Sequence, residues 1–172
     1  YYNERLPRYL KLSHVTDTEV ADVISSATNK KASNVVDAVL LGKYDDKWHA
    51  VAGLNTLTSL KGRLKNYADR SDALRKSGLS SFVITLDAHI PRDSVSSKGE
   101  ISRDSQDAEL VGNHAMFDGL FSFNEETTDD TNGVAPIRTV GSSRYNDSFV
   151  DHAVESWEEF IEPLNSSKTL QI

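Results

Sequence analysis

The stretch FVITLDAHIP, from Phe82 to Pro91, decides the fold class because its apolar residues recur with a period of two. This period is typical of a β-strand that buries one face and turns the other toward solvent. Pro91 would end the strand, because proline has no N–H to donate to a neighbouring strand. The residues predicted to face the core are Phe82, Ile84, Leu86, Ala88 and Ile90.

Asp87 and His89 fall on the opposite, polar face of this predicted strand. Side chains at i and i+2 share a face and could begin a metal site, but such a site needs further ligands from elsewhere. The other histidines show no paired spacing and no HExxH pattern; they are His14, His49, His114 and His152. We interpret Asp87 and His89 as an exposed polar rim, and we expect neither a bound metal nor a cofactor.

Segments before this strand show both helical and strand patterns. Thr16 and Glu19 have capping-box spacing and precede apolar residues at helical spacing, which predicts a helix over 17–28. An apolar run over 34–41 and an alternating run over 48–52 predict a β-hairpin, with a loop at 43–47. A basic helix is predicted next, ending at Gly78, from the helical recurrence of Leu57, Leu60, Leu64 and Tyr67.

Segments after the strand complete the predicted fold. Residues 116–124 and 135–140 have strand patterns, and an amphipathic helix is predicted over 147–162, where Pro163 would stop it. Together the elements predict an α+β fold, in which helices pack on a mostly antiparallel sheet. The length of 172 residues suits one domain, 1–172, with an N-terminal arm at 1–14 and a mobile loop at 92–108.

The composition excludes several kinds of chemistry. The chain has no cysteine, which removes disulfides, thiolate nucleophiles and cysteine-based zinc sites. No apolar run reaches the roughly 18 residues that a membrane-spanning helix requires. Neither a GxSxG nucleophile elbow nor a glycine-rich phosphate loop is present. We therefore expect a protein that is not an enzyme.

The charge is unevenly distributed along the chain. The net charge is −7, yet residues 43–76 contain eight Lys or Arg against four Asp or Glu, and residues 77–130 contain three against eleven. Such asymmetry can drive self-association or contact with an anionic partner, although a merely solvated helix face is the plainer interpretation. The candidate patch for an anionic partner or for self-association comprises Lys61, Arg63, Lys65, Arg70, Arg75 and Lys76.

The order of these elements resembles that of rhabdovirus matrix proteins. The matching segments are the helix at 17–28, AVLLGKYDDKWHAVAGL (38–54), AHIPRD (88–93), FDGLFSF (117–123) and the acidic turn TTDD (127–130). The resemblance fits the globular core of a plant- or arthropod-type matrix protein.

This resemblance implies a non-enzymatic structural protein of the virion and the host cell cytoplasm. It would associate with itself, with the viral nucleocapsid protein and with an anionic membrane surface, and it would recognise no specific nucleic acid sequence. The basic patch of one subunit would meet the acidic 93–130 region of the next, in a contact that builds layers.

Two other functions stay open at this point. A soluble acidic binding or inhibitor module would cover a basic partner with the carboxylates of 93–130 and 151–162. A small metal-dependent hydrolase would use Asp87 and His89 as ligands or as an acid–base pair.

Overall fold

The computed structural model describes residues 2–59, 62–86, 117–123, 137–139 and 148–169. The helices are α1 (Tyr2–Arg5), α2 (Thr18–Thr28), the 3₁₀ helix η1 (Ala32–Asn34), α3 (Leu64–Lys76) and α5 (Ser148–Thr169). The strands are β1 (Leu10–His14), β2 (Ala38–Tyr44), β3 (Lys47–Leu57), β4 (Ser80–Thr85), β5 (Gly119–Ser122) and β6 (Ile137–Thr139). Within these residues, no helix has the length and apolar character to cross a bilayer.

The six strands form one mixed sheet in the order of the chain. Strand β2 pairs antiparallel with β1 and with β3. From β3 onward every neighbouring pair is parallel. The α+β class is confirmed, but the prediction of a mostly antiparallel sheet is wrong. Helix α3 explains why β3 and β4 are parallel. It connects the two strands and returns the chain to the end of the sheet at which β3 begins, so β4 runs in the same direction.

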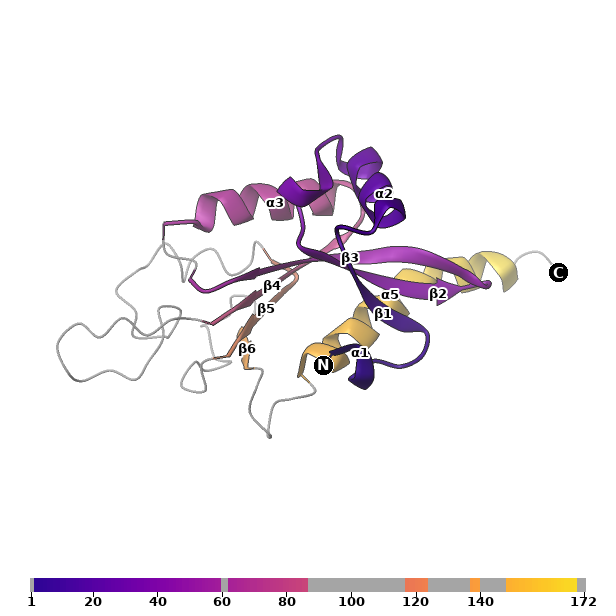
Figure 1. Ribbon diagram of the computed structural model, residues 1–172. Coiled ribbons are helices and arrows are strands. Elements are labelled where there is room, and N and C mark those ends of the chain that lie inside the picture. The colour runs from indigo at the N-terminus through magenta and orange to yellow at the C-terminus, as the bar shows by residue number, and fades with distance from the viewer. Residues whose placement is uncertain (1, 60–61, 87–116, 124–136, 140–147, 170–172) are drawn as a thin grey trace.

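Helices cover both faces of the sheet. Figure 1 shows α2 and α3 on one face and α5 on the other. Strand β4 is therefore buried on both sides: Val83 and Thr85 are as inaccessible as Phe82 and Ile84. The prediction that 82–90 buries only one face is wrong for the described part of this strand, because α3 covers the second face. Asp87 and His89 lie outside the described residues.

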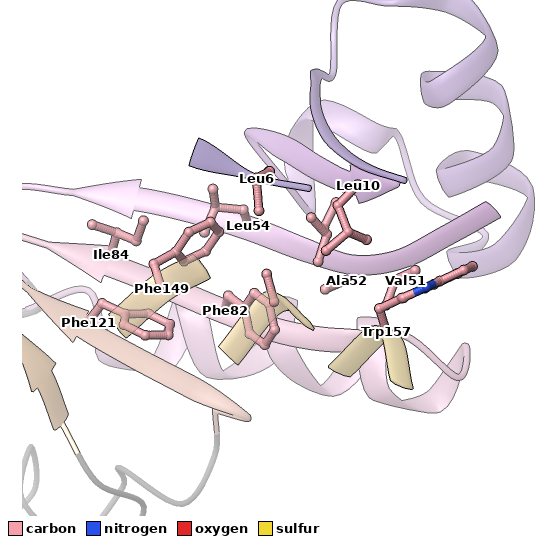
Figure 2. Close-up of a cluster of buried hydrophobic side chains, with 12 residues drawn as sticks. Leu6, Leu10, Val51, Ala52, Leu54, Phe82, Ile84, Phe121, Phe149 and Trp157 are labelled. Carbon is pink, nitrogen blue, oxygen red and sulfur yellow. The ribbon is translucent and has the colours of Figure 1, made fainter. Parts of the chain in front are cut away.

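The core beneath α5 is built on aromatic rings. Phe82 from β4, Phe121 from β5 and Phe149 from α5 are fully buried and meet edge to face (Figure 2). Trp157, two turns further along α5, is also buried and stacks on Phe160 with ring centroids 5.6 Å apart. On the opposite face, α2 and α3 bury a separate aliphatic cluster that includes Ile24, Val39 and Leu74.

The β2–β3 hairpin turns more tightly than its sequence predicts. Strand β2 runs to Tyr44 and β3 begins at Lys47, so only Asp45 and Asp46 form the turn. Both have positive φ, 53° and 59°. Positive φ at both central residues is the requirement of a type I′ turn, which aspartate tolerates better than most residues. The predicted five-residue loop is therefore replaced by a two-residue turn.

Two helices have ends that the sequence placed elsewhere. Leu57 belongs to β3, and α3 begins only at Leu64, after Gly62 with a φ of +71°. Helix α5 continues through Pro163 to Thr169. Tyr44 donates a hydrogen bond to Asn165 Oδ1 at 3.4 Å, so the turn after the proline is attached to the hairpin. This contact helps to offset the backbone hydrogen bond that Pro163 cannot make.

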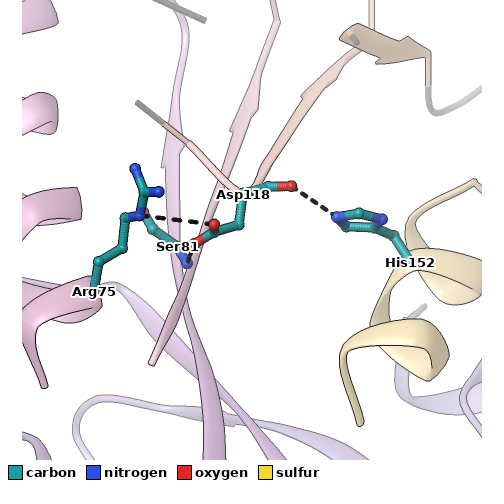
Figure 3. Close-up of polar contacts among 4 residues, drawn as sticks. All are labelled: Arg75, Ser81, Asp118 and His152. Carbon is teal, nitrogen blue, oxygen red and sulfur yellow. Dashed lines mark hydrogen bonds and ion pairs between the residues drawn. The ribbon is translucent and has the colours of Figure 1, made fainter. Parts of the chain in front are cut away.

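Asp118 joins three elements at the start of β5 (Figure 3). Its Oδ2 accepts a hydrogen bond from the backbone N–H of Ser81 at 2.8 Å, and its Oδ1 lies 3.7 Å from Nε of Arg75 in α3. Its backbone carbonyl accepts a hydrogen bond from Nε2 of His152 in α5 at 2.8 Å. Asp118 thus links β4 to both helical layers.

Replacing Asp118 by alanine is expected to lower the free energy of unfolding by about 1.5 kcal/mol, because the N–H of Ser81 loses a charged acceptor. Asp118→Asn is the matched control. It keeps an acceptor for Ser81 and loses only the partly exposed ion pair with Arg75, which contributes at most about 1 kcal/mol. Urea unfolding of both variants checks this. Equal losses would assign the effect to the ion pair instead.

Candidate functional site

The side chains of the predicted basic patch differ in their contacts. Arg75 lies 3.7 Å from Asp118, and Lys76 forms a 2.7 Å ion pair with Asp72. The hydrogen bond and charge of Asp72 raise the pKa of Lys76 above its usual value. Arg63 and Lys65 are exposed near the start of α3, whereas Lys61 lies outside the described residues. These cations therefore have different environments.

Arg70 differs from these cations because neutral groups hold it. Its Nη1 donates to Asn55 Oδ1 at 2.9 Å, and its Nε donates to Asn66 Oδ1 at 3.2 Å. Its guanidinium also lies over the ring of Tyr67, 5.0 Å from the centroid. Three contacts thus fix one side chain of the predicted patch on the face of the sheet that α3 covers.

Asp37 is a functional candidate that the sequence analysis missed. It lies between η1 and β2 and is partly buried. Its backbone N–H donates to the carbonyl of Leu54, and its carbonyl accepts from Val15, so its backbone is attached on both sides. A signal was present in the sequence: Asp37 is the one charged residue in the run NVVDAVLL, from Asn34 to Leu41.

Thr56 holds the side chain of Asp37. Its backbone N–H and its hydroxyl donate to Asp37 Oδ2, at 2.8 and 3.3 Å. The preceding residue, Asn55, has 1% of its surface exposed and donates through Nδ2 to the carbonyl of Val35 at 3.0 Å. The carboxyl end of β3 therefore holds Asp37 through Thr56 and Arg70 through the preceding residue, Asn55.

This site lies at the carboxyl ends of the parallel strands. Thr56 also lines an open hollow of about 320 Å³, together with residues that end β3, β4 and β5. These are Leu57, Thr58, Ile84, Thr85, Leu86 and Phe123. In open sheets with parallel strands, ligands commonly bind beyond the carboxyl ends. The position agrees with a binding site.

The described side chains offer one metal-binding carboxylate here. No group of three or more His, Cys, Asp or Glu residues able to hold a metal occurs in the described part of the chain. Mg²⁺, however, is commonly held by one or two carboxylates together with water and substrate phosphates. Asp37 could serve as such a metal ligand. Thr56 donates both of its hydrogen bonds to Oδ2, and Oδ1 has no hydrogen-bond partner among the described residues.

No family model matches this sequence, and no curated protein matches it. Solved structures with a similar fold include the restriction endonuclease AgeI in a specific complex with DNA. It has 21% identity and a TM-score of 0.65, and the match covers 86% of this chain and 59% of that one. The restriction endonuclease BsaWI in a pre-specific complex with DNA has 16% identity and a TM-score of 0.62, over 90% of this chain and 56% of that one.

These similarities correct the main functional prediction. The prediction of a rhabdovirus matrix protein is wrong, since the similar structures are endonucleases. The expectation of a non-enzymatic protein is overturned by the same finding. So are the expected partners, namely a second copy, a nucleocapsid protein and an anionic membrane, because both similar structures are complexes with DNA. The metal-dependent hydrolase alternative agrees better with them, although Asp87 and His89 lie outside the described residues.

The matrix resemblance rested on the order of the elements, which does not specify the direction of each strand. The parallel run from β3 to β6 is where the observed fold departs from that expectation. This chain spans less than two thirds of the length of both similar structures. It has the fold of restriction endonucleases over most of its own length.

Proposed function

We propose that this chain is a DNA-binding endonuclease, or the core of one, and that phosphodiester hydrolysis takes place beside Asp37. The observation that carries the proposal is the place of Asp37, held by Thr56 at the carboxyl ends of the parallel strands. The fold similarity to two endonucleases bound to DNA supports it.

Hydrolysis of a phosphodiester requires neutralisation of the phosphate charge and an activated water molecule. A divalent cation held by Asp37 would supply both. The role of Thr56 is positional: its N–H and hydroxyl fix Oδ2 and leave Oδ1 to bind.

The net charge of −7 limits where DNA can bind. DNA is a polyanion, so the contact surface must be one where cations outnumber carboxylates. Residues 43–76 contain eight Lys or Arg against four Asp or Glu, and they include Asn55, Thr56 and Arg70. Thr56 and Arg70 therefore belong to the part of the chain with excess positive charge, whereas Asp37 precedes it.

Wild-type protein is expected to cleave plasmid DNA in the presence of Mg²⁺ and to stop when EDTA is added. Asp37→Asn keeps the size of the side chain and removes its charge, and we expect a loss of rate on the order of 100-fold or more. The rate of conversion of supercoiled plasmid to nicked and linear forms measures this.

Asp22→Asn is the matched control, because Asp22 is an exposed aspartate of α2 remote in sequence from Asp37. It should cleave at the wild-type rate. Circular dichroism should give the same melting curve for both variants and the wild type. Full activity in the Asp37→Asn variant would contradict the assignment of this site, and absence of cleavage by the wild type with Mg²⁺ or Mn²⁺ would contradict hydrolysis by this chain.

A further inference from the structure

Arg70 is the cation of the predicted patch whose guanidinium has a fixed direction. Asn55 and Asn66 accept from two of its nitrogens, and Tyr67 supports its plane. An arginine held in this way has less side-chain freedom to lose when it binds a ligand. Its second terminal nitrogen, Nη2, has no hydrogen-bond partner among the described residues and can donate to a ligand.

The orientation of the Asn55 amide determines which of its atoms contacts Arg70. Because Nδ2 of Asn55 donates to the carbonyl of Val35, its Oδ1 is the end turned toward the guanidinium. Asn55 is almost completely buried, and a buried amide is costly unless its polar atoms are paired. Both ends of this amide are paired, so the contact with Arg70 is part of a built arrangement.

The positive charge of Arg70 is not neutralised within the described structure. No carboxylate of the described residues lies within ion-pair distance of its guanidinium, whereas Arg75 faces Asp118 and Lys76 faces Asp72. Among the described residues, the partners of Arg70 are uncharged. A fixed guanidinium without a carboxylate partner is suited to an anionic ligand, and its planar fork matches phosphate oxygens.

The same two chain segments hold Arg70 and Asp37. Asn55 precedes Thr56, the residue that fixes the Asp37 carboxylate. Val35, which orients Asn55, lies two residues before Asp37. The segments that end η1 and β3 therefore set the positions of both side chains.

We infer that Arg70 binds one phosphate of the DNA backbone next to the site of Asp37, and that Asn55 is the positioning residue for its guanidinium. This inference rests on the proposed function, because it takes DNA as the source of the phosphate. A phosphate contact positions DNA without reading its sequence. Arg70 therefore contributes to affinity and placement, and equally for every DNA sequence.

The test is the salt dependence of binding of the whole chain to a short fluorescent DNA duplex, followed by anisotropy in the presence of Ca²⁺. Loss of one phosphate contact reduces the slope of log K against log salt concentration by about 0.9. Arg70→Gln should show this decrease, and its affinity should fall roughly eightfold at about 0.1 M salt. The Arg70→Lys variant should recover the slope, because it keeps the charge, but only part of the affinity, because lysine has no planar fork.

Lys76→Gln is the control, because it removes a charge that Asp72 already neutralises. Its slope and affinity should match those of the wild type. Asn55→Leu tests the positioning role. Alone it should weaken binding roughly two- to tenfold, the cost of ordering a side chain on binding. Added to Arg70→Gln it should weaken binding no further, whereas a purely structural role of Asn55 would weaken binding in both backgrounds.

The outcomes separate the inference from the proposed function. If the wild type binds DNA and Arg70→Gln keeps the wild-type slope, the phosphate contact is overturned and the proposed function stands. If the wild type binds no DNA duplex, the proposed function fails and this inference fails with it. A decreased slope in Arg70→Gln, recovered in Arg70→Lys and unchanged in Lys76→Gln, supports the contact.

Discussion

Replacing Phe82 by alanine is expected to lower the free energy of unfolding by about 3–5 kcal/mol. Phe82 is fully buried at the centre of β4, where the sheet meets α5. Its ring centroid lies 6.2 Å from that of Phe121 and 6.1 Å from that of Phe149, both edge to face. Each such pair adds about 0.5–1.5 kcal/mol beyond burial alone. The substitution therefore leaves a cavity and removes two ring contacts together.

Phe123→Ala is the matched control, since it makes the same chemical change just beyond the end of β5, where 41% of the residue is exposed. It should cost less than about 1.5 kcal/mol, because Phe123 buries less apolar area than the fully buried Phe82. Equilibrium unfolding in urea gives both values. Equal losses in the two variants would mean that the Phe82–Phe121–Phe149 cluster is not the packing centre beneath α5.

Short sequence patterns predict those helix ends that are determined by a few adjacent residues. The capping pattern predicts the start of α2 to within one residue: the cap is Asp17 rather than Thr16, and it accepts from the N–H groups of Glu19 and Val20. Gly78 follows the end of α3 with a φ of +79°, the conformation that glycine adopts most easily. Each of these features is decided within a few residues, so pattern and propensity are enough.

The direction of the strands could not be predicted in the same way. The alternation of Phe82 and Ile84 with Val83 and Thr85 is the same whether β4 runs parallel or antiparallel to β3. It also suggested one exposed face, because Thr85 is polar, whereas α5 buries one face of β4 and α3 covers the other. The direction of pairing depends on how the connecting helix packs on the sheet. That packing joins residues that are distant in the sequence.

The candidate site was hidden for a related reason. Asp37, Thr56 and Arg70 are each ordinary residues in their local context. The contacts that make them a site join residues 19 and 15 positions apart, Asp37 to Thr56 and Asn55 to Arg70. No short motif contains either pair, so only the fold brings the two members of each pair together. The composition places an excess of cations in residues 43–76, which include Thr56 and Arg70 but not Asp37.

Replacing Gly42 by valine is expected to lower the free energy of unfolding by about 3 kcal/mol, near the upper end of what overpacking usually costs. Gly42 lies in β2 beneath Trp157, and a Cβ atom at this position would be 2.8 Å from Cδ2 of Trp157 and closer still to Cε3 and Cζ3. The indole cannot move aside easily, because it is buried and stacked on Phe160. Strand propensity predicts the opposite result, since valine is favoured in strands and glycine is not.

Lys43→Val separates overpacking against Trp157 from the strand propensity of valine. It puts the same residue at the next position of β2, where the side chain is exposed. It should change stability by no more than about 0.5 kcal/mol. A double variant, Gly42→Val with Trp157→Leu, should be more stable than the sum of the single losses predicts, because the smaller side chain leaves room for the valine. Coupling between contacting residues is typically about 0.5–3 kcal/mol. If Gly42→Val were as stable as the wild type, the close approach of Trp157 to β2 would be wrong, and with it the way α5 is seated on the sheet.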